Sequence, residues 1–235
     1  MLIYFIIFFI ISIIGLLSLT RNNQEYKKKA IIFITSLLIV LQAIRSSYVG
    51  IDLPGYLHAY EVCLNYNFIK GDTYQNYELG YSLLMQLLKS IGLSEQLFIS
   101  FISCAIIIPV AVTISRYSQY PITSLMMYYT MGLYVFSFSG LRQSIAIGIV
   151  FLSYRFILDR KLIPFTLLIL LAMSFHLTAI IFFPAYFLFH VQIGRREFVF
   201  VLLLTALLFI YRTPLFRLIY RIYKGSTPTI EYTGA

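Results

Sequence analysis

Long runs of apolar residues, separated by short polar segments, limit this chain to few kinds of fold. A helix that spans a bilayer needs about 20 mostly apolar residues, with about 17 as a lower limit. Runs that reach or approach this length cover residues 2–19, 30–44, 97–115, 122–138, 144–158 and 198–211. Only 11% of the residues are charged, whereas a soluble domain carries about a quarter. We therefore predict an all-α, polytopic integral membrane protein that forms one membrane domain over residues 1–235.

Three segments refine the expected number of helices. Residues 1–19 have no basic n-region and no small-residue cleavage pattern, so we expect a first transmembrane helix rather than a signal peptide. Residues 79–91 are apolar but too short to span, which indicates an interfacial or re-entrant helix. The apolar stretch 162–190 is interrupted near His176, where we expect a hairpin of two short helices. The prediction is a bundle of about eight transmembrane or re-entrant helices.

The distribution of basic residues predicts the orientation of these helices. Residues 21–29 hold four basic side chains, so this loop is expected on the cytoplasmic side. Alternation then places the polar loop 45–78, Arg142 and His176 on the outer side. The basic segment 212–235 would also fall outside, against the positive-inside rule. Either this segment is basic for a functional reason, or the helix count in the C-terminal part is off by one.

Arg142 is the most unusual ionisable residue, because it lies at the start of an apolar run. Ionisable side chains are costly there and are often functional. The preceding Ser139 and Gly140 suit a helix start. A basic residue carries the unfavourable charge for the N-terminus of a helix, so we expect a negatively charged partner for Arg142. Two roles are open for this side chain, which either binds a phosphate or extends to the membrane interface.

Four short segments follow one another in an order that resembles a known family. They are residues 45–56 (RSSYVGIDLPGY), 77–84 (YELGYSLL), 139–146 (SGLRQSIA) and 172–179 (AMSFHLTA). In these segments the chain resembles the EpsG-type family of Wzy-like bacterial polysaccharide polymerases. The resemblance covers roughly residues 44–180. The chain is shorter than typical members, so we expect either a short variant or a truncated product.

The resemblance implies a glycosyltransferase that polymerises a surface polysaccharide, such as a capsule, an exopolysaccharide or an O-antigen. A growing glycan would pass, with inversion, from undecaprenyl pyrophosphate to a hydroxyl group of the next lipid-linked repeat unit. The reaction would take place at the outer face of the bacterial cytoplasmic (inner) membrane. The implied partners are undecaprenyl-pyrophosphate-linked oligosaccharide, membrane lipids, a chain-length regulator and a flippase. The resemblance implies no cofactor.

This chemistry requires cations for the pyrophosphate and a group near the acceptor hydroxyl. We expect Arg142 to stabilise the pyrophosphate charge, and His176 and Asp52 to act near the acceptor. The residues expected to bind substrate are Arg45, Gln143, Glu78, Arg217 and Arg221.

Structural roles compete with several of these assignments. His176 either accepts a proton from the acceptor or bonds a backbone carbonyl at a turn. Asp52 either orients a hydroxyl group or pairs with Arg45. Glu78 is expected mainly to cap the helix that follows it. The tyrosines of the loop 45–78 either stack on sugars or lie at the membrane interface, and we expect the interface for most of them.

Two other classes of function stay open. In these interpretations the chain is either a transporter or flippase of lipid-linked oligosaccharide, or a non-catalytic membrane subunit of a polysaccharide export complex.

Arg217 and Arg221 share a helix face and bind either a second pyrophosphate or anionic lipid headgroups. No HExxH or CxxC spacing occurs, so no metal site is expected. Much of the net charge of +9 lies in short loops, so nucleic acid is not an expected partner.

Overall fold

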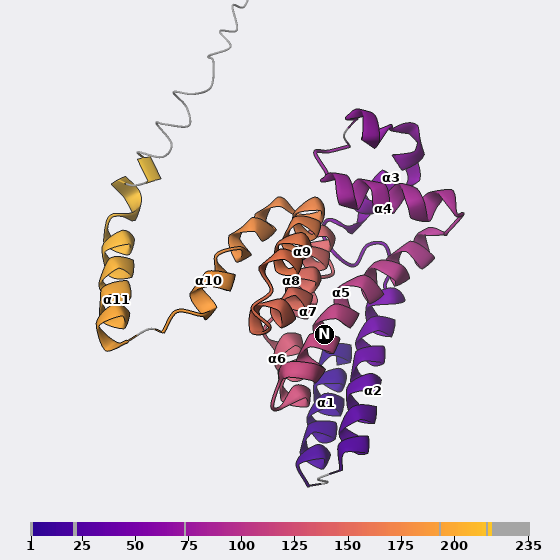
Figure 1. Ribbon diagram of the computed structural model, residues 1–235. Helices are drawn as coiled ribbons and strands as arrows, with labels where there is room; N and C mark the ends of the chain where they lie inside the picture. The colour runs from indigo at the N-terminus through magenta and orange to yellow at the C-terminus, as the bar shows by residue number, and fades with distance from the viewer. Residues whose placement is uncertain (1, 21–22, 73, 193, 215, 218–235) are drawn as a thin grey trace, which may run out of the picture. The chain divides into compact units, whose positions relative to one another are not determined.

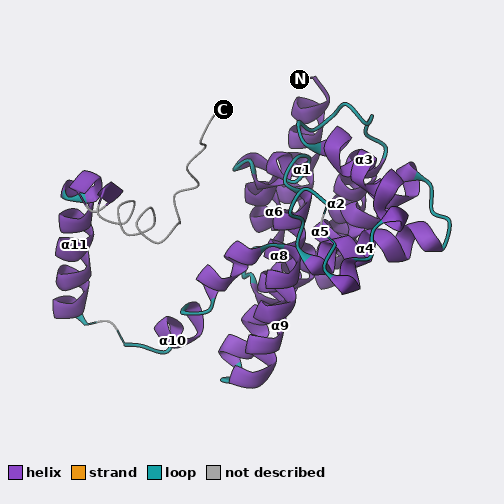
Figure 2. Cartoon of the chain, turned by 90° about the horizontal axis from the view of Figure 1, so that it is seen from above, coloured by secondary structure: helices purple, strands orange, loops and turns teal. Residues whose placement is uncertain are grey.

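The described part of the protein is entirely helical. The structure is a computed structural model that describes residues 2–20, 23–72, 74–192, 194–214 and 216–217. These residues form α-helices and short 3-10 helices, and no strand occurs among them (Figures 1 and 2). The predicted all-α fold class is therefore confirmed. The chain divides into two compact units, Met1–Phe189 and His190–Ala235.

The first unit is built around a layer of packed apolar helices. Helix α5 (Glu95–Tyr117) contacts α2 (Gln24–Ala43) and α8 (Leu141–Leu158), and α8 also packs against α9 (Leu162–Phe175) (Figure 1). Helix α1 (Leu2–Thr20) contacts α2. Side chains that these helices bury together include Ile34, Leu38, Phe98, Ile102, Ile106 and Ile145. Burying such apolar surface is the main favourable contribution to packing outside a membrane, and close van der Waals contact is the main one within it.

A smaller helical group lies at one end of this layer (Figure 1). It consists of α3 (Leu53–Val62), η1 (Cys63–Asn65), η2 (Phe68–Lys70) and α4 (Leu79–Ser90). Helix α4 packs against α3 and also against α9. The polar loop that the sequence places between two membrane helices is thus a folded element, and it reaches the end of α9.

The apolar run 122–138 does not form the single membrane helix that we predicted. It forms α6 (Pro121–Thr130) and the one-turn helix α7 (Leu133–Phe136), and the chain turns between them at Met131 and Gly132. The turn ends the first helix after ten residues. Hydropathy alone does not reveal this break, because Met131 within the turn and Leu133 after it are apolar.

The chain also breaks at His176, close to the predicted position. Helix α9 ends at Phe175, and His176 has an extended backbone. The expected second short helix is instead the 3-10 helix η3 (Leu177–Phe182) followed by α10 (Ala185–Phe189). Pro184 lies between these two pieces. A proline has no backbone N–H to donate, which accounts for the interruption.

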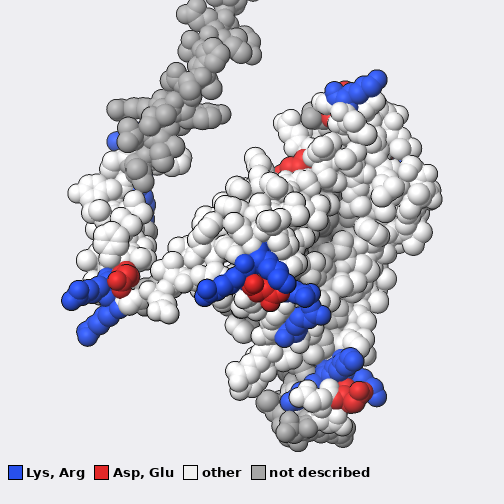
Figure 3. Space-filling view, viewed as in Figure 1, with Lys and Arg blue, Asp and Glu red and all other residues white. Residues whose placement is uncertain are grey.

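Two described helices, α5 and α8, are long and apolar enough to cross a membrane. Shorter apolar helices cover Tyr4–Ser18, Leu162–Phe175 and Leu177–Phe189. Charged side chains gather in a few groups, with uncharged surface between them (Figure 3). In the second unit, α11 (Arg195–Ile210) is an apolar helix with no buried residue.

Candidate functional site

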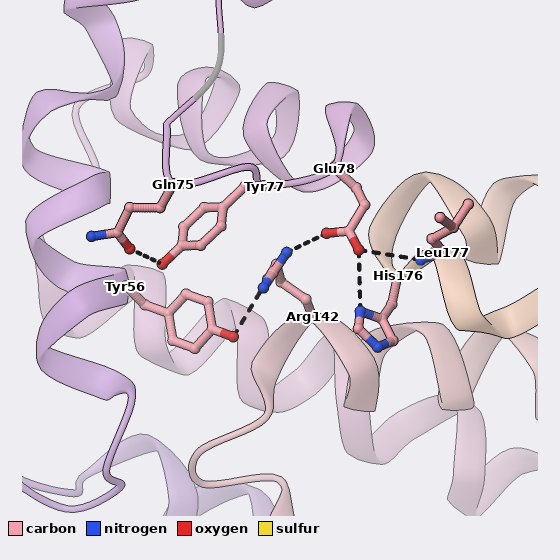
Figure 4. Close-up of polar contacts among 7 residues, drawn as sticks. All are labelled: Tyr56, Gln75, Tyr77, Glu78, Arg142, His176 and Leu177. Carbon is pink, nitrogen blue, oxygen red and sulfur yellow. Dashed lines mark hydrogen bonds and ion pairs between the residues drawn. The ribbon is translucent and has the colours of Figure 1, made fainter. Parts of the chain in front are cut away.

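The carboxylate of Glu78 joins three segments that are far apart in the sequence. Its Oε2 atom accepts a hydrogen bond from Nη1 of Arg142 and forms an ion pair with it. Its Oε1 atom lies 3.1 Å from Nδ1 of His176 and accepts a bond of 3.2 Å from the backbone N–H of Leu177 (Figure 4). Glu78 is therefore the centre of a polar cluster that includes Arg142 and His176.

Each member of the cluster lies at the end of a helix. Glu78 occupies the N-cap position of α4, but its side chain makes no capping hydrogen bond, contrary to our expectation of a mainly capping role. Arg142 lies in the first turn of α8, and His176 follows the last residue of α9. The negatively charged partner that we predicted for Arg142 is present, and it is Glu78. The ion pair offsets the unfavourable position of a cation at a helix N-terminus.

A close approach between α4 and α9 brings Glu78 to His176. Gly80 lies so near to Ser174 that a Cβ atom at this position would be 2.7 Å from the Ser174 carbonyl oxygen. Any larger residue would have to push the two helices apart. Gly80 therefore sets the distance between the start of α4 and the end of α9.

Aromatic side chains enclose Arg142 on the side away from Glu78. The Cζ atom of Arg142 lies 4.4 Å from the centre of the Tyr77 ring, and its Nε donates to the Tyr56 hydroxyl at 3.5 Å (Figure 4). The Tyr77 hydroxyl in turn donates to Oε1 of Gln75 at 3.1 Å. Stacking of a cation on a ring holds the guanidinium plane in one orientation. The sequence indicated these tyrosines only as interfacial or sugar-stacking residues, and it held no signal for their contact with Arg142.

The cluster is partly open to solvent and strongly polar. The exposed fractions of the Arg142, Glu78 and His176 side chains are 21%, 20% and 24%. Burial opposes ionisation of Glu78, but the backbone N–H groups of Glu78 and Leu177 and the charge of Arg142 outweigh it and lower the Glu78 pKa. Burial also raises the pKa of Tyr77 to about 12. Among the described residues, no three His, Cys, Asp or Glu side chains are grouped as metal ligands would be.

An apolar groove begins beside the cluster and follows α8. A pocket of about 240 Å³ is lined by Gln143 and His176 at its polar end. A second pocket, of about 290 Å³, extends to Tyr117 and Tyr154. The two pockets share Val150, Phe151 and Phe182 as lining residues. The groove therefore extends from His176, at the edge of the cluster, along an apolar space, which suits a ligand with an anionic head and a hydrocarbon chain.

The remaining predicted residues lie in other places. Arg45 is buried, with an exposed fraction of 6%, and donates to the carbonyl oxygen of Phe138. Asp52 is exposed at the start of α3, and the described residues show no ion pair between it and Arg45. Arg217 belongs to the second unit, and Arg221 is outside the described residues.

The geometry of the cluster defines what its groups can do chemically. If Nδ1 of His176 donates to Glu78, the Nε2 atom is left as a proton acceptor. Arg142 uses Nη1 for Glu78 and Nε for Tyr56, and no described residue bonds its Nη2 group. An arginine has five N–H donors, so donors remain for a phosphate. With this tautomer of His176, the site combines a proton acceptor with an anion-binding group.

Two described helices of membrane-spanning length and a polar cluster beside an apolar groove fit a helical, membrane-associated class of protein. The model of the EpsG family matches residues 28–232, and the chain belongs to this family. Membership implies a membrane protein that resembles polysaccharide polymerases. No curated protein and no solved structure matches the chain.

Proposed function

We propose that the protein is a polysaccharide polymerase that acts on lipid-linked repeat units. The observation that carries this proposal is the Glu78 carboxylate, which holds Arg142 and His176 together beside an apolar groove. An anion-binding group, a proton acceptor and room for a hydrocarbon chain are the three features that such a substrate needs. The proposed donor is a growing glycan on undecaprenyl pyrophosphate, and the acceptor is a hydroxyl group of the next lipid-linked unit.

Arg142 binds the pyrophosphate and stabilises the negative charge of this leaving group. A bond forms between the acceptor oxygen and the anomeric carbon of the donor, while the bond from that carbon to the pyrophosphate oxygen breaks, with inversion. Negative charge on the leaving pyrophosphate grows during this step, so a positioned guanidinium lowers the barrier. Gln143 lies exposed beside Arg142 and offers an amide to the same substrate.

His176 removes the proton of the acceptor hydroxyl as the new bond forms. The hydrogen bond from Nδ1 to Glu78 orients the imidazole and stabilises its protonated form. Asp52 lies one helical turn before Tyr56, and we assign it to the acceptor sugar, where a carboxylate can accept hydrogen bonds from hydroxyl groups. Glu78 acts on both parts of the reaction through its contacts to Arg142 and His176.

In this proposal, residues 1–235 form one multi-pass domain in the bacterial cytoplasmic membrane. The domain has about eight transmembrane or re-entrant helices. The cluster faces the outer side. Arg217 and Arg221 bind a second pyrophosphate or anionic headgroups of membrane lipids. The proposed protein partners are a flippase that supplies the substrate and a chain-length regulator, and the polysaccharide is a capsule, an exopolysaccharide or an O-antigen. Nucleic acid and cofactors have no part in this proposal.

An elongation assay tests the proposal. The full-length protein is purified, placed in liposomes and incubated with undecaprenyl-pyrophosphate-linked repeat units extracted from cells that lack it. A ladder of lengthened lipid-linked products is the expected result. Unchanged substrate that moves across the bilayer would instead indicate a transporter or flippase. Unchanged substrate without movement would indicate a non-catalytic subunit, and either outcome overturns the polymerase.

A further inference from the structure

Two buried polar side chains at the end of α2 hold the segment that leads to Arg142. Gln42 is completely buried, and its Nε2 donates to the Ser137 carbonyl oxygen at 3.0 Å and to the Ser137 hydroxyl at 3.1 Å. Arg45 donates from Nη1 to the Phe138 carbonyl oxygen at 3.0 Å. Its Cζ atom also lies 4.9 Å from the centre of the Phe138 ring. Both side chains thus bond the backbone of Ser137 and Phe138, which belong to residues 137–139, and we call these three residues the lead segment.

The chain just after Arg45 reaches the same segment. The backbone N–H of Ile51 donates to the Ser139 hydroxyl at 3.0 Å. Gly50 has a φ of +116°, and a Cβ atom there would be 2.9 Å from the carbonyl carbon of Phe138 and would overlap its oxygen. Only glycine fits such a backbone at such a distance. Residues 42–51 therefore contact each residue of the lead segment.

The lead segment continues directly into α8. Gly140 is the N-cap of this helix, Leu141 is fully buried, and Arg142 is the second helical residue. A shift of the lead segment therefore moves the first turn of α8. That turn carries the guanidinium that meets Glu78, so its position determines the geometry of the cluster.

Burial of a charged and an amide group at this place costs free energy. Among the described residues, Nε of Arg45 and Oε1 of Gln42 have no hydrogen-bond partner, and no carboxylate pairs with Arg45. Apolar residues of similar size would fill the same volume at a lower cost. Burial lowers the pKa of Arg45 to about 10, so its guanidinium still stays protonated at pH 7. These groups fit a role in positioning better than a role in packing alone.

We propose that Gln42 and Arg45 are positioning residues, which fix the lead segment so that Arg142 meets both Glu78 and the pyrophosphate. The catalytic consequence of this inference rests on the proposed function. Arg45 acts through Arg142 and does not touch the substrate.

Hydrogen exchange of the purified full-length protein tests the positioning without any assay of activity. The variants are Arg45→Met, Gln42→Leu and the conservative Arg45→Lys. The control is Arg155→Met, at an exposed arginine near the other end of α8. Loss of a hydrogen bond from a charged donor, or of the two bonds that the Gln42 amide donates, changes a local equilibrium by about tenfold or more. Amides of residues 137–145 should therefore exchange at least about tenfold faster in Arg45→Met and Gln42→Leu than in the wild type. The increase should be smaller in Arg45→Lys, and the control should exchange at the wild-type rate. Unchanged exchange in Arg45→Met and Gln42→Leu overturns the inference.

A double-mutant cycle tests the catalytic consequence. Misplacement of a reacting group by 1 Å can cost about 10²-fold in rate, so kcat/KM for elongation of lipid-linked repeat units should fall by up to about that factor in Arg45→Met. The rate is measured per folded molecule, and Arg45→Lys should recover part of it. In the Arg142→Ala background, Arg45→Met should cost less than about twofold, because coupled residues are not additive.

Full additivity in this cycle would show that Arg45 acts independently of Arg142, either on the substrate or on stability alone, and would overturn the inference. If Arg45→Met does not fold, Arg45→Lys and Gln42→Leu are taken through the same cycle. A wild-type protein that makes no lengthened product contradicts the proposed function, whereas the exchange experiment still decides the positioning.

Discussion

At the residue scale, Glu78 matters because one carboxylate serves donors from α8 and from the end of α9. A change to glutamine removes the charge of Glu78 and keeps its shape, so it tests whether that charge is needed. Glu78→Gln should leave expression similar and lower the rate of elongation by about 10²-fold to 10⁴-fold, as loss of the carboxylate does in other histidine-based sites. The initial rate of product formation, at equal protein concentration, measures this effect.

The matched control is Glu61→Gln, which removes a carboxylate that is 55% exposed and outside the cluster. Its elongation rate should equal that of the wild type. A Glu78→Gln protein that elongates as fast as this control would remove Glu78 from the mechanism.

The lowered pKa of Glu78 predicts a dependence of stability on pH. Between its pKa in the folded protein and its ordinary value of 4.5, the unfolded chain binds more protons, so stability rises with pH. The contribution is complete above this range and is lost as the pH falls through the folded pKa. The melting temperature of the detergent-solubilised wild type should therefore fall more steeply below pH 4.5 than that of Glu78→Gln. Parallel melting curves in both proteins would show that Glu78 has no such linkage.

The sequence predicted part of this site. The position of Arg142 at a helix start indicated a negatively charged partner, which the ion pair with Glu78 confirms. The partner itself was not predictable, because Glu78 lies 64 residues away and no local pattern links the two. The burial of Arg45 was not predictable for the same reason. It depends on a contact with Phe138, which lies 93 residues further along the chain.

At the element scale, the contact of α4 with α9 decides whether Glu78 reaches His176. Gly80→Ala should force these helices apart, because the added Cβ atom meets backbone and side chain of Ser174. We expect the melting temperature to drop and elongation to fall by at least about tenfold, since the cluster loses its geometry. Thermal unfolding and the elongation assay on the same preparation measure both effects.

Gly55→Ala is the control for this prediction. Gly55 lies within α3, and nothing is within 4 Å of a Cβ atom at this position. Alanine is the better helix former, so this change should leave activity intact and keep or raise stability. Equal behaviour of the two alanine variants would show that the contact of Gly80 with Ser174 is not needed.

Long apolar runs were enough to predict most long helices, but not their interruptions. The predicted helix 97–115 corresponds to Glu95–Tyr117, because a long apolar run with polar ends has few alternatives. The run 122–138 also contains no charged residue and yet divides at Gly132. Breaks of this kind arise from local backbone geometry and tertiary contacts. The mean hydropathy of a segment contains no information on either of them.

At the scale of the whole molecule, α8 places Arg142 and the turn at Lys161 at opposite ends of one apolar helix. If α8 crosses the membrane, the two ends lie on opposite sides. In a protein whose native cysteines are replaced, Gln75→Cys should react with an impermeant maleimide in intact cells. Lys161→Cys should react only after the cells are permeabilised. Labelling of both positions from the same side would contradict the topology.

The central claim is that the Arg142 cluster catalyses glycan transfer, and the elongation rate of a single variant tests it most directly. Purified wild type and Arg142→Ala are given the same lipid-linked repeat units, with Arg116→Ala, an exposed arginine at the end of α5, as control. Removing one group that stabilises transition-state charge costs about 10²-fold to 10³-fold, so Arg142→Ala should elongate at least about 10²-fold more slowly. The control should match the wild type. An Arg142→Ala protein that makes polymer at the wild-type rate would contradict the claim.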